Sequence, residues 1–390
     1  MRVLHTADWH LGRQIRGRSR QDEFEAVLAE VAAIVRSERV DLLLVAGDIF
    51  DTFSPAPEAE KLLYETLEQM VREGAQVVLL AGNHDHARHM DALTRVLRLA
   101  GIHCFGSVTA DPALARVAIP SRDRSEVAQI VALPWVPERF TFDFESLARG
   151  LEKPLAQYAE RMERLIRHLW SKPDPKAVNI FAGHMLISGA EIGPGGGERQ
   201  LQIGQNFAVK ASALPDDAEY VALGHVHKPQ QIAAASRVEY SGSLLQLDFG
   251  EADQKRSVNL VELRPGLPPD VRRLELKGGR PLRNVTVRFA DLPRLAEEHA
   301  GAYLKVTVEL DEFVPALAQK VHDLVPNAVE VTPPKLPAAA SGPDPREQRR
   351  GLQPHELFAS FYRSKRGTDA PAELVRLFNQ LLTEAERASP

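Results

Sequence analysis

The sequence is poor in cysteine, in aromatic residues and in long apolar runs. Its 390 residues include one cysteine, Cys104, and only 6% aromatic residues. A single cysteine excludes an internal disulfide framework and a thiolate metal cluster, and it fits a reducing compartment. No run approaches the roughly 18 apolar residues of a membrane span, and the N-terminus lacks a stretch resembling a signal peptide. These absences predict a cytoplasmic protein with no membrane contact.

The sequence also lacks a strong excess of charge and a nucleotide-binding motif. A net charge of −5 gives no global reason to bind nucleic acid, so any such contact must come from local basic patches. The glycine-rich segment 189–200 is not followed by Gly-Lys-Ser/Thr, which excludes a P-loop. The remaining composition, 44% hydrophobic and 26% charged, describes a globular chain, and its length predicts two or three domains.

Apolar runs alternate with helical patterns from residue 1 to about 275. This alternation predicts a layered α/β domain over residues 1–275, with β-sheets flanked by helices. Residues 276–332 predict a small α/β domain with the order β-α-β-α-β. Residues 333–351 contain five prolines and no apolar period, which is typical of a linker. Residues 352–390 predict two short amphipathic helices as a C-terminal tail.

Polar side chains follow five of the predicted strands, at the point where each apolar run ends. Open α/β sheets place their sites at the carboxyl ends of strands, so we expect these side chains to lie close together. A set of His, Asp and Asn without sulfur suits a divalent cation such as manganese, iron or zinc. The set consists of Asp8, His10, Asp48, Asn83, His184, His225 and His227.

Each of these residues also has an ordinary structural interpretation when taken alone. A carboxylate after a strand, such as Asp8 or Asp48, more often caps a helix or a turn. His184 alone resembles a hydrogen-bonded core histidine, Asn83 can be a turn residue, and the histidines of segment 225–227 can alternate on a strand edge. The conjunction of polar clusters at five strand ends is what predicts a binuclear metal site.

In chain order, the motifs D-x-H, G-D-x-x-D, G-N-H-D, G-H and G-H-x-H resemble the calcineurin-like metallophosphoesterase superfamily over residues 1–250. In that superfamily two metals share a bridging aspartate. The resemblance implies one metal on Asp8, His10, Asp48 and His227, and a second on Asp48, Asn83, His184 and His225.

The two residues after Asn83 in the G-N-H-D motif, His84 and Asp85, are the candidate catalytic residues. The resemblance implies that His84 lies just outside the metals, where it would protonate the leaving oxygen or hydrogen-bond the phosphate. Asp85 can orient His84, cap the following helix or brace the turn. Because Asp51 occupies a position where archaeal and eukaryotic relatives commonly carry a second histidine, its role stays open.

Longer stretches resemble the SbcD family of DNA repair nucleases: HTADWHLG (5–12), GDIFDTFSPAP (47–57), ALGHVHKPQ (222–230) and YSGSLLQLDFGE (240–251). The resemblance implies a manganese-dependent nuclease with exonuclease action on duplex ends and endonuclease action on single strands or hairpins. It further implies a role in double-strand break repair, an SMC-like ATPase partner of the SbcC type, a homodimer, a capping role for the small domain and a nucleoid-associated location in the cytoplasm.

Two other functions remain open from the residues. One is a phosphoesterase of the same fold that acts on small molecules or proteins. The other is a DNA-end-binding scaffold with a vestigial metal site, which is disfavoured because no ligand position is missing.

Two further segments are candidate binding surfaces. A basic loop directly after the first ligands can grip DNA phosphates, although it can also be an ordinary solvated loop. It contains Arg13, Arg16, Arg18 and Arg20. The C-terminal helices carry apolar faces that predict docking on the ATPase partner, the alternative being that they fold back on their own domain. These faces contain Leu357, Phe358, Phe361, Tyr362, Leu374, Leu377, Phe378 and Leu381.

Overall fold

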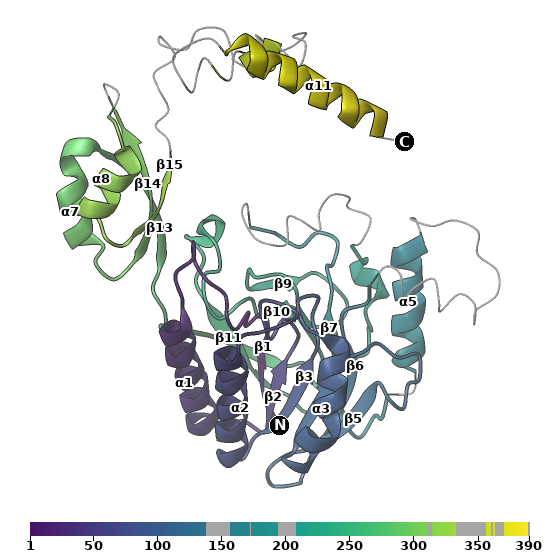
Figure 1. Cartoon of the computed structure of the whole chain (residues 1–390). Helices are drawn as coiled ribbons and strands as arrows, with labels where there is room; N and C mark the ends of the chain where they lie inside the picture. The colour runs from purple at the N-terminus through teal and green to yellow at the C-terminus, as the bar shows by residue number, and fades with distance from the viewer. Residues whose placement is uncertain are drawn as a thin grey trace. The chain divides into compact units, whose positions relative to one another are not determined.

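The computed structural model describes residues 1–137, 157–171, 173–193, 208–310, 314–332, 356–359, 362 and 370–388. Two six-stranded sheets form the centre of the first 275 residues (Figure 1). In spatial order, the first sheet consists of β12 (Asp270–Glu275), β11 (Ser257–Glu262), β1 (Arg2–Thr6), β2 (Leu42–Val45), β3 (Gln76–Leu80) and β4 (Ile102–Phe105). The second consists of β5 (Arg116–Pro120), β6 (Val127–Leu133), β7 (Val178–His184), β8 (Tyr220–Gly224), β10 (Val238–Tyr240) and β9 (Gln230–Ile232).

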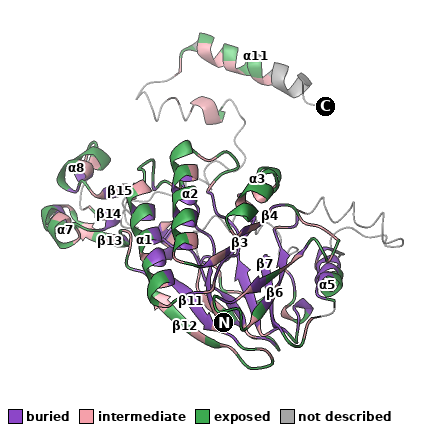
Figure 2. Ribbon diagram, turned by 90° about the horizontal axis from the view of Figure 1, so that it is seen from below, coloured by how far each residue is buried: buried purple, intermediate pink, exposed green. Residues whose placement is uncertain are grey.

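The two sheets pack face to face through an apolar core. Leu42 and Leu44 from the first sheet share this core with Val178 and Ile180 from the second. The outer face of the first sheet is covered by α1 (Gln21–Ser37), α2 (Pro57–Arg72) and α3 (Ala87–Leu99), and that of the second by α5 (Gln157–Leu169). Figure 2 shows the result, with buried strands inside and the exposed faces of the helices outside. The layered α/β fold predicted from the sequence is confirmed.

The parallel strands run in a common direction within each sheet, which gathers their carboxyl ends. β1, β2, β3 and β4 are mutually parallel neighbours, as are β6, β7 and β8. Their apolar runs are continuous because helices cover one face and the other sheet covers the opposite face. Three strands were not predicted from the sequence, namely β4, β5 and β12.

A smaller three-stranded sheet follows the sandwich. It contains β13 (Leu282–Arg288), β14 (Tyr303–Glu309) and β15 (Ala328–Thr332), with α7 (Leu292–Glu298) and α8 (Leu317–Leu324) in the connections. A short 3-10 turn of the sandwich, η3 (Phe249–Glu251), contributes to an apolar cluster with this small domain. Residues 1–308 and 315–332 form one compact unit, which contains both the sandwich and the small domain.

The second compact unit contains residues 309–314 and 333–390. Its described part includes α11 (Ala372–Ala388) and a helical turn at 356–359. Phe358 stacks on Phe378 with ring centroids 4.4 Å apart, while Leu377 and Leu381 are exposed. The predicted linker 333–351 and Phe361 lie outside the described residues.

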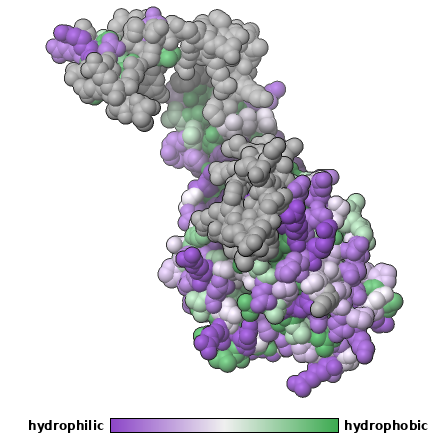
Figure 3. Space-filling view, turned by 90° about the vertical axis from the view of Figure 1, so that its right-hand side faces the viewer, coloured by the Kyte–Doolittle hydropathy of each residue, from purple (hydrophilic) through white to green (hydrophobic). Residues whose placement is uncertain are grey.

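On the face drawn in Figure 3, hydrophilic side chains predominate over scattered apolar ones. Among the described residues, no helix is both long and apolar enough to cross a membrane.

Candidate metal centre

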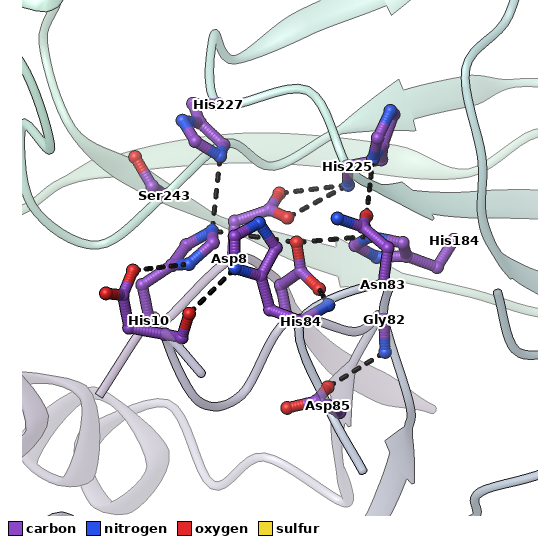
Figure 4. Close-up of polar contacts among 12 residues, drawn as sticks. Asp8, His10, Gly82, Asn83, His84, Asp85, His184, His225, His227 and Ser243 are labelled. Carbon is purple, nitrogen blue, oxygen red and sulfur yellow. Dashed lines mark hydrogen bonds and ion pairs between the residues drawn. The ribbon is translucent and has the colours of Figure 1, made fainter. Parts of the chain in front are cut away.

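The structure brings the polar strand ends together at one place (Figure 4). Four of the seven candidate ligands follow β1, β2 and β3 of the first sheet, and the other three end or follow β7 and β8 of the second sheet. Potential ligand atoms lie within 4.8 Å of one another in three groups: Asp8, His10 and His227; Asp48, His184 and His225; and His10, Asp48 and His84. Asn83 joins the second group through its side-chain oxygen, so all seven candidate ligands converge.

Asp8, His10 and His227 form one part of this site, here called the His227 half-site. The Nε2 atoms of His10 and His227 face each other at 3.2 Å inside the protein. Burial lowers the pKa of His10 to about 4, so that its ring is neutral and offers a lone pair. Burial raises the pKa of Asp8 to about 7, and a bound cation would reverse that shift. These donors fit a divalent cation.

Asn83, His184 and His225 form the other part, here called the His184 half-site. The Oδ1 atom of Asn83 lies 3.0 Å from His184 Nε2 and 2.9 Å from His225 Nδ1. Burial lowers the pKa of His225 to about 3, which keeps this ring neutral as well. The amide oxygen and the imidazole nitrogens therefore point at a common space without adding negative charge.

Asp48 lies between the two half-sites. Its Oδ2 atom is 3.6 Å from His10 Nε2 and 3.4 Å from His184 Nε2. Burial alone would raise the pKa of Asp48, but the positive charge of the adjacent His184 lowers it well below its usual range. An ionised carboxylate in this position can serve both half-sites.

Groups behind the site orient two of its histidines. The Nδ1–H of His184 donates to the carbonyl oxygen of Ala46 at 2.8 Å, and the Nδ1–H of His227 donates to Oε1 of Glu251 at 2.8 Å. In both rings this leaves Nε2 directed at the site. Burial is the largest single effect and opposes ionisation of Glu251, but the interactions with His227, Arg256 and the backbone N–H of Leu247 together lower its pKa to about 2. Glu251 was not among the residues predicted from the sequence.

The backbone and the ring of His84 are both hydrogen-bonded beside the two half-sites. Its backbone N–H donates to Oδ1 of Asp48 at 2.8 Å, and its Nδ1–H donates to the carbonyl oxygen of Asp51 at 2.8 Å. Its ring lies edge-on to that of His10, with centroids 4.7 Å apart. The half-buried ring therefore keeps Nε2 for a ligand at the site.

Asp51, whose role the sequence left open, supports both neighbouring histidines. Its carbonyl oxygen holds His84, and its carboxylate lies 3.3 Å from Nδ1 of His10 and 3.1 Å from Nη1 of Arg13. The ion pair with Arg13 keeps this carboxylate beside the His227 half-site.

Asp85 is corrected from a catalytic residue to a structural one. Its carboxylate accepts hydrogen bonds from the backbone N–H groups of Gly82 (2.8 Å), Ile49 (3.1 Å) and Phe50 (2.9 Å). It does not cap the following helix, because the N-cap of α3 is His86. The carboxylate points back into the loop after β2, so that of the three expected roles Asp85 takes the bracing of the turn.

The basic loop differs from the expected DNA-binding surface. Arg20 is buried, pairs with Glu23 and donates to a backbone carbonyl, so its assignment as a DNA-binding residue is wrong. Arg16 forms ion pairs with residues 248 and 330, and Arg18 donates to the carbonyl oxygen of residue 326. These two side chains connect the loop to the small domain, because the loop folds against η3 and β15. Arg13 is directed at the site through its pair with Asp51.

The backbone of the site is locally strained. Asp8, His10, Asp48 and His225 have φ angles of 52°, 49°, 50° and 95°, values that non-glycine residues rarely adopt. Such conformations cost on the order of 1–3 kcal/mol each and persist where the surrounding structure over-determines them. Gly82 allows a close approach of two loops, since a Cβ atom there would lie 2.0 Å from Oδ1 of Asp48.

Trp135 is a further site residue that was not predicted from the sequence. Its ring stacks on His225 with centroids 5.2 Å apart, and its backbone N–H donates to the carbonyl oxygen of Ala81 at 2.9 Å. It follows β6 directly, as the ligands follow their strands, so its strand-end position was the available signal. The indole forms an apolar wall on the His184 half-site.

Comparison with known proteins identifies the family. Residues 1–229 match the calcineurin-like phosphoesterases, and residues 278–366 match a family described as type 5 capsule protein repressor C-terminal domain. The chain is 32% identical to the SbcD subunit of nuclease SbcCD from Bacillus subtilis over 99% of each chain. It is 33% identical to the same subunit from Rhodobacter capsulatus, covering 93% of this chain and 94% of that one. The Escherichia coli subunit is 28% identical over 83% of this chain and 82% of its own. The chain therefore belongs to the calcineurin-like phosphoesterases and, among them, to the SbcD nuclease subunits.

Proposed function

We propose that this chain hydrolyses phosphodiester bonds of DNA with two divalent metal ions. The observation that carries the proposal is the position of Asp48 between two half-sites of imidazole, carboxylate and amide donors, with His84 beside it. Two divalent ions would bring four positive charges and the carboxylates of Asp8 and Asp48 would return two. When bound, the ions supply charge that attracts phosphate and lower the pKa of the attacking water.

The ligand assignment follows from the half-sites. One ion would be held by the His227 half-site together with Asp48, and the other by the His184 half-site together with the same carboxylate. The donors are imidazole, carboxylate and amide groups without sulfur, which suit manganese, iron or zinc. Manganese is the proposed ion because the resemblance to the SbcD family implies it.

His84 is proposed to act on the phosphate directly. The bond from its Nδ1–H to the carbonyl oxygen of Asp51 fixes the ring, so that Nε2 can hydrogen-bond the phosphate or protonate the leaving oxygen. Proton transfer by a positioned side chain typically contributes about 10²–10⁴-fold to the rate.

The names of the relatives, which are D subunits of nuclease SbcCD, support a nucleic acid as the substrate and a second subunit as the partner. We propose exonuclease action on duplex ends and endonuclease action on single strands or hairpins, in double-strand break repair at the nucleoid in the cytoplasm. Arg13 remains the member of the basic loop that can meet a phosphate near the site. The apolar side chains of 356–388 would dock on an SbcC-type ATPase.

A homodimer through α2 and α3 is part of the same proposal. Among the residues of α3, only Met90 is buried, while Val96 and Leu99 are 67% and 90% exposed. Tyr64 of α2 is also partly exposed. A helix that leaves this much apolar surface in water is suited to pack against a second copy of itself.

The proposal is tested by comparing substrates. Labelled duplex and hairpin DNA and p-nitrophenyl phosphate esters are incubated with the protein, each with Mn²⁺ and with EDTA. We expect cleavage of DNA with Mn²⁺ and none with EDTA. Hydrolysis of the small esters without any attack on DNA would instead favour a phosphoesterase for small molecules or proteins, and DNA binding without hydrolysis of either substrate would favour a scaffold.

A further inference from the structure

A buried ion pair stands directly behind His227. Glu251, on the turn η3, accepts from Nδ1–H of His227 at 2.8 Å and pairs with Nη2 of Arg256 at 3.0 Å. The second carboxylate oxygen also accepts from the backbone N–H of Leu247 at 2.8 Å. All of these contacts lie inside the protein, where a carboxylate is retained only when it is fully hydrogen-bonded.

The same ion pair also holds the backbone of His227. Nη1 of Arg256 donates to the carbonyl oxygen of His227 and to Oγ of Ser243, each at 2.8 Å. The backbone N–H of Ser243, which Figure 4 shows beside His227, donates to that carbonyl as well, at 3.2 Å. Both the ring and the main chain of this candidate ligand are therefore fixed by one pair of side chains.

The turn that carries Glu251 is bound to the small domain. Phe249 is buried in a cluster with Ile15, Leu282 and Tyr303, two of which belong to the small domain. The side-chain N–H of Asn284, on β13, donates to the carbonyl oxygen of Phe249 at 2.9 Å. The small domain therefore contacts the turn η3 at Phe249, two residues before Glu251.

Gln246 adds a second connection between the small domain and the turn. Its Oε1 atom accepts from the backbone N–H of Leu282 at 2.7 Å, and its Nε2 donates to the carbonyl oxygens of Glu251 (3.1 Å) and Ala252 (2.8 Å). One amide side chain therefore links the first residue of β13 to the residue that orients His227.

The other half-site is anchored within the sandwich. His184 donates to the carbonyl oxygen of Ala46, directly after β2, and His225 stacks on Trp135, after β6. A movement of the small domain would reach the His227 half-site through η3 and would leave these anchors in place.

We propose that Glu251 is the positioning residue of His227, and that docking of the small domain on η3 sets the metal affinity of the His227 half-site. This inference rests on the proposed function, because it treats the two half-sites as metal sites. A ligand whose ring is held in one tautomer and one orientation binds a cation more tightly than a mobile one. The small domain would then control one metal of the pair.

The first experiment replaces Glu251 and reads the metal-free protein. Imidazole ¹⁵N spectra should show His227 protonated on Nδ1 in the wild type and in Glu251→Gln, whose amide oxygen still accepts, and a mixture of tautomers in Glu251→Ala. Calorimetric titration with Mn²⁺ should show affinity at one of two sites falling about 10- to 100-fold in Glu251→Ala, with most of it restored in Glu251→Gln.

A matched control is Glu239→Gln, because Glu239, on β10, is a buried carboxylate paired with Arg237 and with Arg273 of β12. It should change neither the tautomer of His227 nor either Mn²⁺ affinity. Two unchanged affinities in Glu251→Ala, or an unchanged tautomer, would overturn the role of Glu251.

The second experiment loosens the docked small domain without touching Glu251. The double variant Asn284→Ala with Tyr303→Ala should weaken Mn²⁺ binding at the same single site, by about tenfold, whereas Gln319→Ala on the exposed face of α8 should not. Unchanged affinity in the double variant would refute control by the small domain. Neither readout uses DNA. If the variants respond as expected but the wild type cleaves no DNA, the proposed function alone would be refuted.

Discussion

Asn83, His84 and Asp85 are adjacent in the chain and have three different surroundings in the fold. The amide of Asn83 faces two histidines, the ring of His84 is held by Asp51, and the carboxylate of Asp85 accepts three backbone N–H groups. On the proposed function, one short turn would separate metal binding, contact with the phosphate and support of the backbone.

Replacing His84 tests that separation. His84→Ala should keep two metals and DNA binding but lose about 10²–10⁴-fold in cleavage rate, because it removes a group that acts on the phosphate. Asn83→Ala should instead weaken the binding of one of the two metal ions. Elemental analysis and the cleavage rate are measured on the same preparations, and loss of both metals from His84→Ala would contradict a position outside the metals.

The seven candidate ligands could be named because each ends or follows an apolar run in a parallel strand, where side chains converge, whereas Trp135 in the same kind of position was overlooked. Glu251 could not, since it meets His227 only through the tertiary fold, 24 residues further along the chain. Arg20 was misassigned for a related reason. A basic residue in a loop is usually solvated, but here the start of α1 turns it inward toward Glu23.

At the scale of elements, the loop after β3 is fitted closely against the loop after β2. Asp85 ties the two loops through Ile49 and Phe50, and the backbone N–H of His84 binds Asp48. The close approach requires glycine at position 82.

Gly82→Ala tests this fit. The added methyl group would meet the side chain and backbone of Asp48, so we expect a loss of about 1–3 kcal/mol in the free energy of unfolding and weaker Mn²⁺ binding. Gly301→Ala is the control, because a methyl group at that position would have no neighbouring atom within 4 Å. Chemical denaturation and Mn²⁺ titration give the two quantities; equal results for both variants would count against the close packing.

The strands covered on both faces were predictable from their continuous apolar runs, as β2 and β3 show. β12 was not, because it is an edge strand whose residues are mostly exposed and polar, and its pairing with β11 supplies the signal that its own pattern lacks. The order of strands across the two sheets also depends on contacts between distant segments.

At the scale of the whole molecule, the exposed apolar residues of α3 offer a test of whether the protein is a monomer or a dimer. Leu99→Glu should convert the proposed dimer to a monomer, because a charge would be buried in the contact. Leu267→Glu, at a residue that is 52% exposed on another part of the sandwich, is the control. Sedimentation velocity reports the mass, and a wild type that is already monomeric would exclude this interface.

The C-terminal tail is expected to carry the contact with the ATPase. Removal of residues 352–390 should abolish capture of an SbcC-type partner while leaving metal content and cleavage of hairpin DNA by the isolated subunit unchanged. The exposed Leu377 and Leu381 are the surface concerned. A pull-down with the full-length chain as reference measures this, and undiminished capture by the truncated chain would place the contact elsewhere.

The most direct test of the binuclear mechanism is to titrate metal-free protein with Mn²⁺ and to follow bound metal and hairpin DNA cleavage in the same samples. We expect two ions bound per chain and cleavage that rises with filling of the second site. Full cleavage in EDTA, or full cleavage with a single ion bound, would contradict the binuclear mechanism.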